Sequence, residues 1–374
     1  MAGRLRIGVI GGGVVAQAEH IPNLRAMPDL FDLRLVADPS AMVRSFLSDR
    51  YGVRAVPDAG ALLGEPLDAV IVASPDPLHL DHVGAALAAG LHVFCEKPLT
   101  YAADDIAGLA DRRDRAGRVL QTGYMKRFDP AYETLLGLLP GQDGALCRIA
   151  VEVTDPDAGP FIGQHAVLAG TDLPPAASER LGRLRAEQVA RAVPAVLDDL
   201  SFRGFCGAFA SSIVHDVNAV HGMLDVLGIA GGTAIGAAFF AGGAGGQGAV
   251  LLPDGGALWT MSHLTVPGLP HYSERITLTF EGSALELEFP SPWLNHAPTR
   301  LTERRARNGA LETRHVRAGY AEAFVEELKG FHAAVTAGAP VRNTAEAAAR
   351  DMRLLADLTA LHAARSRLQG EAAA

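Results

Sequence analysis

The chain has 374 residues, of which 49% are hydrophobic and 20% are charged, and its formal net charge is −9. This length predicts two domains with full cores, and the composition argues against any long disordered stretch. The negative charge excludes nucleic acid as a partner, because phosphate binding needs a concentrated positive face. Apolar runs in the sequence are all much shorter than a membrane span, so no membrane partner is expected.

The first third of the chain alternates short β-branched runs with helical patterns, which is typical of βαβ units. The expected strands are Arg6–Ile10, Arg34–Ala37, Ala69–Ala73, Val93–Cys95 and Val119–Gly123, and the expected helices are Ala16–Met27, Ser40–Tyr51, Asp58–Leu63, Leu78–Ala89 and Ala103–Ala116. Together they predict an α/β Rossmann domain over residues 1–128.

After this point the pattern changes, and residues 129–374 are expected to form an α+β domain with a large open, mainly antiparallel sheet. The expected elements are helices at Pro130–Leu139, Ala176–Ala192, Ser211–Leu227, Glu322–Ala337 and Glu346–Ala364, a strand at Leu146–Thr154, a loop at Asp155–Pro175, and strands from Ala234 to Phe289 with breaks that include Asp254-Gly255-Gly256. The last helix is a candidate to pack back on the first domain. The insert at 155–203 is long for a connection and is a candidate roof for a pocket, although the sequence leaves its role open.

A basic stretch at 300–317 is interrupted by acidic and amide residues and is interpreted as a solvated surface loop. The three cysteines, Cys95, Cys147 and Cys206, are widely separated and are expected to be buried thiols. Their spacing and the lack of a signal-peptide pattern predict a reducing, cytoplasmic location. Metal-ligand spacing is absent from the sequence, so no metal is expected.

A glycine-rich turn, Gly11-Gly12-Gly13-Val14-Val15-Ala16, follows the first strand and opens the first helix, as the G-x-G-x-x-G/A motif requires. Gly11 permits the tight turn, Gly13 allows the backbone to approach a pyrophosphate, and Ala16 allows close helix–strand packing. Val14 and Val15 lie where the first N–H groups of the helix are expected to bind phosphate. Simple turn chemistry in a glycine-rich chain is the alternative.

Asp38 ends the second strand, where a carboxylate can accept both ribose hydroxyls of adenosine. The same carboxylate repels a 2′-phosphate, and no basic residue stands directly beside it, since Pro39 and Ser40 follow and Arg44 is a helical turn and a half away. NAD is therefore expected rather than NADP. A role as N-cap of the next helix is the alternative for Asp38.

The tripeptide Glu96-Lys97-Pro98 stands at the carboxyl end of a buried strand, the edge where open α/β sheets bind ligands. A desolvated lysine there can accept a hydroxyl proton, and its ammonium form can stabilise an alkoxide. Glu96 is expected to bind ribose or the nicotinamide amide, or to pair with a neighbour, and the peptide before Pro98 is a candidate cis bond. The Ser74-Pro75 turn and His79 are expected near the nicotinamide side of the crevice.

These features resemble the glucose–fructose oxidoreductase, inositol dehydrogenase and rhizopine-catabolism (Gfo/Idh/MocA) family. The resemblance is carried by Gly11–Ala16, Asp38, Ser74-Pro75 with His79, Glu96-Lys97-Pro98, the run Gly123–Pro130, and His215-Asp216-Val217-Asn218. It implies a Rossmann domain followed by an α+β domain, and oxidation or reduction of a secondary alcohol on a sugar or cyclitol. It also implies a homodimer or homotetramer formed through the sheet face.

The resemblance further implies a general acid/base at His215, although Ser211 stands where the family usually has an aspartate. His221 is the alternative histidine. With Lys97, the residues expected to contact substrate hydroxyls are Tyr124, Lys126, Ser211, His215 and Asn218.

The sequence therefore predicts an NAD-dependent oxidoreductase acting on a sugar, glycoside or cyclitol. An NADPH-linked ketosugar reductase and a non-catalytic nucleotide-binding sensor are the alternatives, and the presence of Lys97 together with His215 argues against the sensor.

Overall fold

A computed structural model describes residues 3–156, 159–253 and 256–373. The chain divides into two compact units: unit 1 comprises Met1–Tyr124, Ile162–Ala192 and Phe324–Arg350, and unit 2 comprises Met125–Phe161, Val193–Ala323 and Asp351–Ala374. This division differs from the expected split at residue 128, because part of the insert and part of the C-terminal region return to unit 1.

Within the described residues, unit 1 contains a six-stranded parallel sheet with the order β3-β2-β1-β4-β5-β6. Its strands are β1 (Leu5–Ile10), β2 (Phe31–Ala37), β3 (Arg54–Val56), β4 (Ala69–Val72), β5 (His92–Glu96) and β6 (Leu120–Gly123). Its helices are α1 (Ile21–Ala26), which continues a π-helical turn at Ala16–His20, α2 (Ala41–Tyr51), α3 (Ala59–Leu63), α4 (His79–Ala88), α5 (Ala103–Ala116), α8 (Pro175–Ala192), α11 (Ala323–Ala337) and the start of α12 (Ala345–Ala373). The Rossmann prediction is confirmed.

The core of unit 1 explains why α11 belongs to it. Strand β4 is apolar along its length, and β5 is apolar from Val93 to Cys95, because helices cover both faces of a parallel sheet. Leu328 and Phe331 of α11 are completely buried in the same cluster as Ile71 and Phe94. Burying side chains of this size stabilises the unit by about 1.5–3 kcal/mol each.

Unit 2 contains, within the described residues, an eight-stranded sheet with the order β14-β13-β12-β11-β7-β10-β9-β8. Its strands are β7 (Leu146–Asp155), β8 (Thr233–Phe240), β9 (Gly245–Leu251), β10 (Leu258–Thr265), β11 (Ser273–Phe280), β12 (Ser283–Phe289), β13 (Arg300–Arg307) and β14 (Ala310–Val316), and its helices are α6 (Pro130–Leu138), α7 (Gly159–Ile162), α9 (Asp199–Gly204), α10 (Val214–Leu227) and the remainder of α12. All neighbouring strands are antiparallel except β7 and β10, so the expected mainly antiparallel sheet is confirmed.

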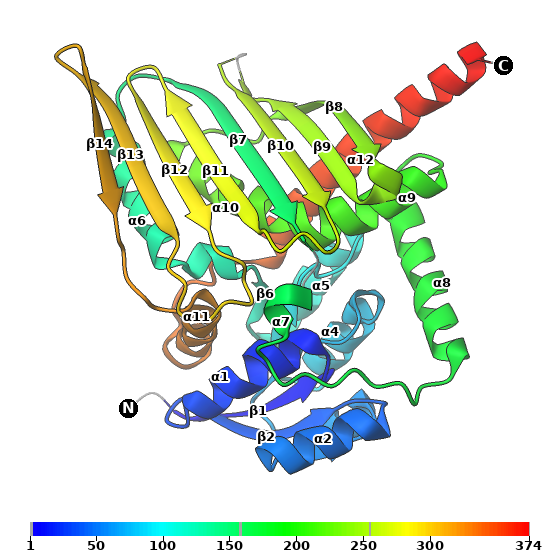
Figure 1. Ribbon diagram of the computed structural model, residues 1–374. Helices are drawn as coiled ribbons and strands as arrows, with labels where there is room; N and C mark the ends of the chain where they lie inside the picture. The colour runs from blue at the N-terminus through cyan, green and yellow to red at the C-terminus, as the bar shows by residue number, and fades with distance from the viewer. Residues whose placement is uncertain (1–2, 157–158, 254–255, 374) are drawn as a thin grey trace. The chain divides into compact units, whose positions relative to one another are not determined.

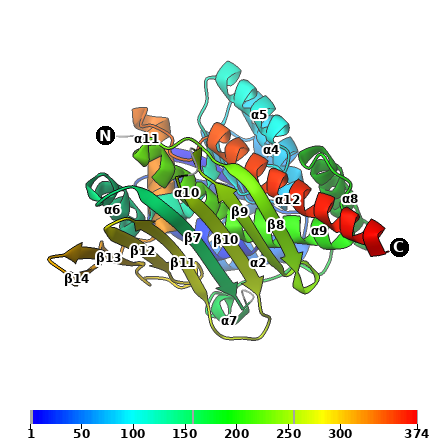
Figure 2. The ribbon, with the colours of Figure 1, turned by 90° about the horizontal axis from the view of Figure 1, so that it is seen from above.

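Helices cover one face of this sheet. A π-helical stretch, Phe205–Ile213, joins α9 to α10, and Phe209 within it contacts Phe239 of β8 with ring centroids 4.7 Å apart. The later part of α12 runs beside β8 and β9 (Figure 2), where His362 contacts Phe239 and Leu358 lies against Gly248. Among the described residues of unit 2, no helix covers the opposite face of strands β7, β8, β9 and β10 (Figure 1).

Several predicted boundaries were wrong. The helix expected to begin at Ser211 is the end of a continuous helical stretch that begins at Asp199, and the loop expected over 155–175 contains α7. The short strand β3 was not predicted. Residues 157–158 of that loop and Asp254-Gly255 of the expected turn lie outside the described residues. Of the cysteines, Cys95 is buried as expected, whereas Cys147 is exposed.

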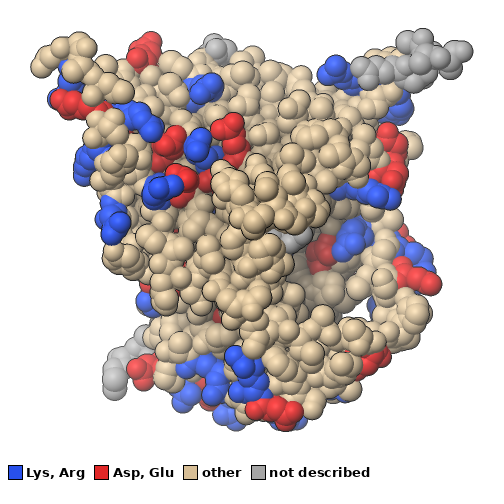
Figure 3. Space-filling view, in the orientation of Figure 1, with Lys and Arg blue, Asp and Glu red and all other residues tan. Residues whose placement is uncertain are grey.

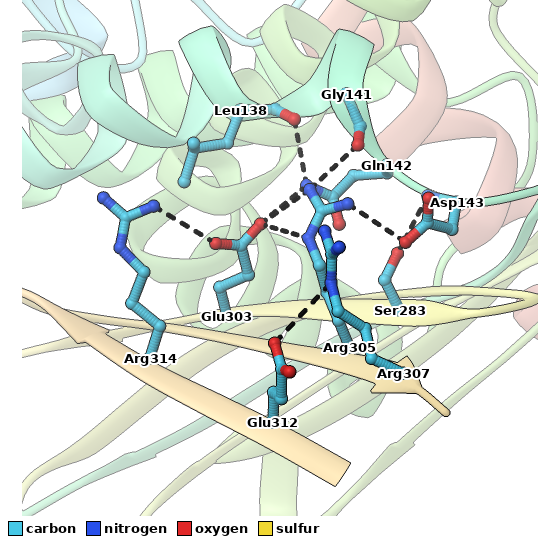
Figure 4. A network of polar contacts seen from close by, with 10 residues as sticks. All are labelled: Leu138, Gly141, Gln142, Asp143, Ser283, Glu303, Arg305, Arg307, Glu312 and Arg314. Carbon is cyan, nitrogen blue, oxygen red and sulfur yellow. Dashed lines mark hydrogen bonds and ion pairs between the residues drawn. The ribbon is translucent and has the colours of Figure 1, made fainter. Parts of the chain in front are cut away.

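The basic stretch 300–317 forms the hairpin β13–β14 rather than a loop. Asn308 and Gly309 both have positive φ, 52° and 76°, as a two-residue hairpin turn requires. Glu303, only 5% exposed, accepts hydrogen bonds from Arg305 and Arg314 (Figure 4). Arg305 lies two residues along the same strand and Arg314 is the cross-strand partner of Glu303. Acidic and basic side chains therefore lie intermixed over the hairpin (Figure 3).

A hollow of about 680 Å³ lies along this hairpin, lined by Leu138, Glu303, Arg305, Arg307, Glu312, Thr313 and Arg314. Its arginines are paired with carboxylates: Arg307 with Glu312, for example, at 3.6 Å. The hollow therefore offers no concentrated charge for a ligand. Among the described helices, none combines the length and the apolar character needed to cross a bilayer.

Candidate functional site

The glycine-rich turn of unit 1 has the geometry of a dinucleotide-binding turn. Gly11 has φ +99°, and a Cβ there would lie 2.5 Å from the carbonyl oxygen of Ala73, so only glycine fits. Its N–H donates to the Ala37 carbonyl at 2.8 Å. A Cβ at Gly13, in contrast, would have no described atom within 4 Å. The exposed Gly13 and Val14 therefore leave the start of the helix open to a phosphate group.

Asp38 lies beside this turn at the end of β2. Its Oδ2 accepts a hydrogen bond from the Gly12 N–H at 2.9 Å, and its Oδ1 accepts one from the Ser40 N–H at 2.8 Å. The N-cap of α2 is Ser40, whose Oγ accepts from the Val43 N–H at 3.1 Å. The alternative in which Asp38 itself caps the helix is therefore wrong.

Arg44 lies closer to Asp38 than its position in the helix suggested. Its Nη1 donates to the carbonyl oxygens of Asp38 and Pro39, both at 2.9 Å. A basic group therefore stands at the carboxyl end of β2 after all, and the argument for NAD from a missing cation is wrong at this point.

Lys97 follows β5 and is half-buried, and the Lys97–Pro98 peptide is cis, as expected. His79, 1% exposed, contacts the Pro98 carbonyl through Nδ1 at 2.8 Å and the Ser74 carbonyl through Nε2 at 2.7 Å. Both ring nitrogens are thus engaged with backbone, and His79 joins the turn after β4 to the turn after β5. Pro75 is exposed, and the Ser74 hydroxyl contacts His82 Nδ1 at 2.9 Å.

Glu96 is buried immediately before Lys97. Its Oε1 contacts His20 Nε2 at 2.7 Å, and its Oε2 accepts from the Lys97 N–H at 3.2 Å. Burial alone would raise the pKa of Glu96, but the hydrogen bond from His20 and the charges of His20 and Lys97 outweigh it and lower that pKa. The pairing of Glu96 with a neighbour, one of its two expected roles, is present.

The insert lies along the same carboxyl edge of the unit 1 sheet. Arg185 of α8 donates to Asp76 through Nη2 at 2.7 Å, and Gln188 donates to the Pro77 carbonyl at 2.8 Å and accepts from Thr100 at 3.2 Å. These contacts join α8 to the turns that follow β4 and β5. Local sequence patterns do not reveal these contacts, because the partners are separated by about 90–110 positions.

In unit 2, Ser211 and His215 occupy one side of a helical stretch. Ser211 is exposed and His215 is half-buried, and their spacing of four residues puts them on one face. His221 is buried instead, and its Nδ1 contacts Asp351 Oδ1 at 2.6 Å. Asn218 donates to the other oxygen of Asp351 at 2.7 Å. Asn218 and His221 therefore belong to a buried cluster, and His215 is the more accessible of the two histidines.

Lys126 lies inside unit 2 rather than at a surface. Its Nζ is 2.8 Å from Asp216 Oδ1 and also forms an ion pair with Glu274, whose other oxygen accepts from the Tyr272 hydroxyl at 2.7 Å. Lys126, Asp216 and Glu274 are all at most 5% exposed. Lys126 is thus already paired with the carboxyl groups of Asp216 and Glu274, so the predicted contact with a substrate hydroxyl would have to compete with these two partners.

Tyr124, at the end of unit 1, is completely buried, and its carbonyl accepts from Asn343 at 2.9 Å. The structure therefore brings the cofactor candidates of unit 1 to one sheet edge, and places Tyr124, Lys126 and Asn218 in the interiors of their units. Glu274 and Asp351 were missed, since an isolated acid in a strand or helix carries no local signal.

Unit 1 has a glycine-rich turn before a helix, an acid at the end of the second strand and a lysine after the fifth. This combination is typical of nicotinamide-dinucleotide-binding domains of oxidoreductases. Residues 5–124 match the family model described as "Oxidoreductase family, NAD-binding Rossmann fold". Over this segment, about a third of the chain, the sequence is similar to the Gfo/Idh/MocA family.

Curated relatives agree over the same region. The chain is 34% identical to inositol 2-dehydrogenase 3 of Saccharopolyspora erythraea over 137 residues, which are 36% of this chain and 40% of the relative. It is 35% identical to the rhizopine catabolism protein MocA of Rhizobium meliloti over 134 residues, 35% of this chain and 41% of the relative. The chain thus spans about two fifths of the length of the curated relatives it matches.

Solved structures share the fold over nearly the whole chain. KijD10, a 3-ketoreductase from Actinomadura kijaniata crystallised with NADP, has a TM-score of 0.71 at 20% identity, covering 96% of this chain and 98% of KijD10. The UDP-N-acetylglucosamine 3-dehydrogenase GnnA from Acidithiobacillus ferrooxidans has a TM-score of 0.68 at 19% identity, with coverages of 96% and 98%. At these identities the likeness concerns the fold.

Proposed function

We propose that this protein is an NAD-dependent oxidoreductase that acts on a secondary alcohol of a sugar, glycoside or cyclitol. The observation that carries the proposal is the carboxyl edge of the unit 1 sheet, where the open turn at Gly13 and the carboxylate of Asp38 lie and where Lys97 directly follows β5. Relatives named inositol 2-dehydrogenase support the substrate class.

The residues that would hold the dinucleotide are those of the turn and of the neighbouring strand ends. The N–H groups at Gly13, Val14 and Val15 would bind the pyrophosphate, and Asp38 would accept the ribose hydroxyls. Ser74, Pro75 and His79 would shape the nicotinamide end, together with Glu96. When bound, the nicotinamide supplies the acceptor or donor of hydride.

Lys97 has the chemistry to accept the hydroxyl proton and to hold the alkoxide oxygen by charge-assisted hydrogen bonding. The hydrogen bonds of His79 to the Ser74 and Pro98 carbonyls, and the Glu96 contact to the Lys97 N–H, fix the backbone on both sides of it. His215 is the second candidate for proton transfer, with Ser211 on the same helix face as a candidate hydroxyl contact. This assignment makes His79 a positioning residue.

An NADPH-linked ketosugar reductase is the second candidate. The observation in its favour is Arg44, whose guanidinium contacts the Asp38 and Pro39 carbonyls, where it could reach a 2′-phosphate. The reductase would use Lys97 in the reverse reaction, as a proton donor rather than a proton acceptor.

The test is a screen of NAD and NADP reduction over free sugars, glycosides, inositols and sugar acids, followed by nicotinamide absorbance. With the best substrate, Lys97→Met should lower kcat by about a thousandfold, because both proton transfer and alkoxide stabilisation are lost, while the Kd for NADH stays within about threefold. Lys329→Met, at a lysine whose side chain is 46% exposed, is the matched control.

The outcomes separate the candidates. Faster turnover with NADPH and a ketosugar would favour the reductase. Tight NADH binding that Lys97→Met leaves unchanged, with no turnover in any pairing, would instead favour a non-catalytic sensor.

A further inference from the structure

A segment of the insert, Leu168–Asp172, here called the strap, lies on the dinucleotide turn of unit 1. The Leu168 N–H donates to Gln17 Oε1 at 2.8 Å, and Gln17 Nε2 donates to the Leu168 carbonyl at 2.9 Å. The same Nε2 donates to the Gly12 carbonyl at 2.6 Å. Because Gln17 is 2% exposed, a buried amide holds the strap against the turn.

The far end of the strap reaches the start of α2. Asp172 Oδ2 accepts hydrogen bonds from the N–H groups of Ala41, at 2.7 Å, and Met42, at 3.2 Å, while Oδ1 accepts from the Ser40 hydroxyl. The Ser40 hydroxyl, with these backbone donors, lowers the pKa of Asp172 below its ordinary value. An ionised carboxylate therefore occupies the donors at the start of this helix.

Gly170 makes this approach possible. A Cβ at this position would lie 2.4 Å from Ser40 Oγ and 2.7 Å from Ser40 Cβ. Any side chain here would therefore push the strap away from Ser40.

These donors are the ones that a 2′-phosphate would need. Asp38, at the end of β2, is the acid expected to accept the ribose hydroxyls, and Ser40, Ala41 and Met42 follow it directly. A phosphate on the 2′-oxygen would require N–H and O–H donors and a cation close to Asp38. Arg44 supplies the cation, but the nearest donors are taken by Asp172.

We propose that Asp172 is a specificity-determining residue of the dinucleotide site, and that its carboxylate, carried to α2 by the strap, excludes the 2′-phosphate of NADP. The inference rests on the proposed function, since it concerns the same nucleotide. It assigns a role to the insert, whose residues lie about 130 positions from the helix they contact. It would also account for the proposed preference for NAD although Arg44 is present.

The experiment is a titration of the full-length protein with NADH and NADPH, followed by nicotinamide fluorescence, so that no substrate is needed. The unchanged protein should bind NADH at least about tenfold more tightly than NADPH, because a 2′-phosphate would meet the carboxylates of Asp38 and Asp172 and would find the donors at the start of α2 already bound to Asp172. Asp172→Ala should tighten NADPH binding by about tenfold or more while the Kd for NADH changes by less than about threefold.

Three further variants identify the cause. Asp172→Asn keeps an acceptor without the charge and should show a smaller gain for NADPH. Gly170→Val, which displaces the strap and leaves Asp172 in the chain, should reproduce the gain. Arg44→Ala in the Asp172→Ala background should abolish it, because the cation that would receive the phosphate is removed.

The two proposals fail differently. If the unchanged protein binds NADH and the preference is the same in Asp172→Ala, or if both affinities fall together, this inference is overturned and the proposed function stands. A protein that binds NADPH as tightly as NADH before any change also overturns it. If neither nucleotide binds, the proposed function falls and the inference with it.

Discussion

At the scale of single residues, Lys126 lies in the interior of unit 2 between the carboxyl groups of Asp216 and Glu274. Burial and the charge of Glu274 raise the pKa of Asp216 to about 8, although Lys126 opposes the rise. With this raised pKa, the folded state is expected to hold a proton on Asp216 at neutral pH that the unfolded chain releases.

This difference predicts how stability depends on pH. The folded pKa of Asp216 is raised from 3.8, so its contribution to stability is complete below pH 3.8 and is lost as the pH rises through about 8. Asp216→Asn, which carries no titratable proton, should remove a slope of up to about 1.4 kcal/mol per pH unit. Urea unfolding between pH 5 and pH 8 measures it, with the exposed Asp111→Asn on α5 as control. An identical slope in Asp216→Asn and the unchanged protein would contradict the assignment.

At the scale of elements, the glycine-rich turn offers a matched pair of substitutions. In Gly13→Ala the new methyl group meets open space in the described structure, so the melting temperature should stay within about 1 °C. The Kd for NADH should rise by about tenfold, because the methyl group fills the approach to the pyrophosphate. Gly11→Ala, at φ +99° and 2.5 Å from the Ala73 carbonyl oxygen, should lower the melting temperature by several degrees as well. Thermal unfolding and NADH titration test both. Unchanged NADH binding in Gly13→Ala would mean that the turn does not hold a phosphate.

Helices and strands that are determined by residues close together in the chain could be predicted from the sequence. Helix α5 has the predicted bounds, because its apolar residues repeat with the helical period and Gly117, at φ +61°, ends it. Strand β4 could be recognised because a strand buried on both faces is a continuous apolar run. The β13–β14 hairpin was missed because charged residues dominate it, although Asn308-Gly309 between the two strands was the available signal.

The residues of the candidate site also fall into two groups, those with a local signal in the sequence and those without one. Gly11, Asp38 and Lys97 each have a signal in their immediate neighbours, namely a turn motif or the end of an apolar strand. The pairs that hold the site together have none: His20 and Glu96 are 76 positions apart, Ser40 and Asp172 are 132 apart, and Lys126 and Glu274 are 148 apart. Such contacts depend on strand order and on where the insert returns, which local patterns do not encode.

At the scale of the whole molecule, one face of the unit 2 sheet is covered by no described helix of unit 2, and this face is the candidate surface for self-association. Leu251 of β9 and Leu258 of β10 are register partners, 40% and 37% exposed, whereas their neighbours Val250 and Trp259 are completely buried on the helix-covered side. Because side chains alternate along a strand, both leucines project from the face that no helix of unit 2 covers. Exposed apolar residues grouped on a sheet favour an interface with a second copy of the chain.

The oligomer expected from the sequence can therefore be tested at this face. Leu251→Glu combined with Leu258→Glu would place two carboxylates in a protein–protein interface, and should reduce the mass measured by size-exclusion chromatography with light scattering by a factor of about two or more. Val226→Glu, at a residue of α10 that is 43% exposed, is the matched control and should leave the mass unchanged. Because both leucines are partly solvated in the single chain, the double variant should keep its circular dichroism spectrum. A mass that does not change in the double variant, or an unchanged protein that is already monomeric, would show that this face is not the interface.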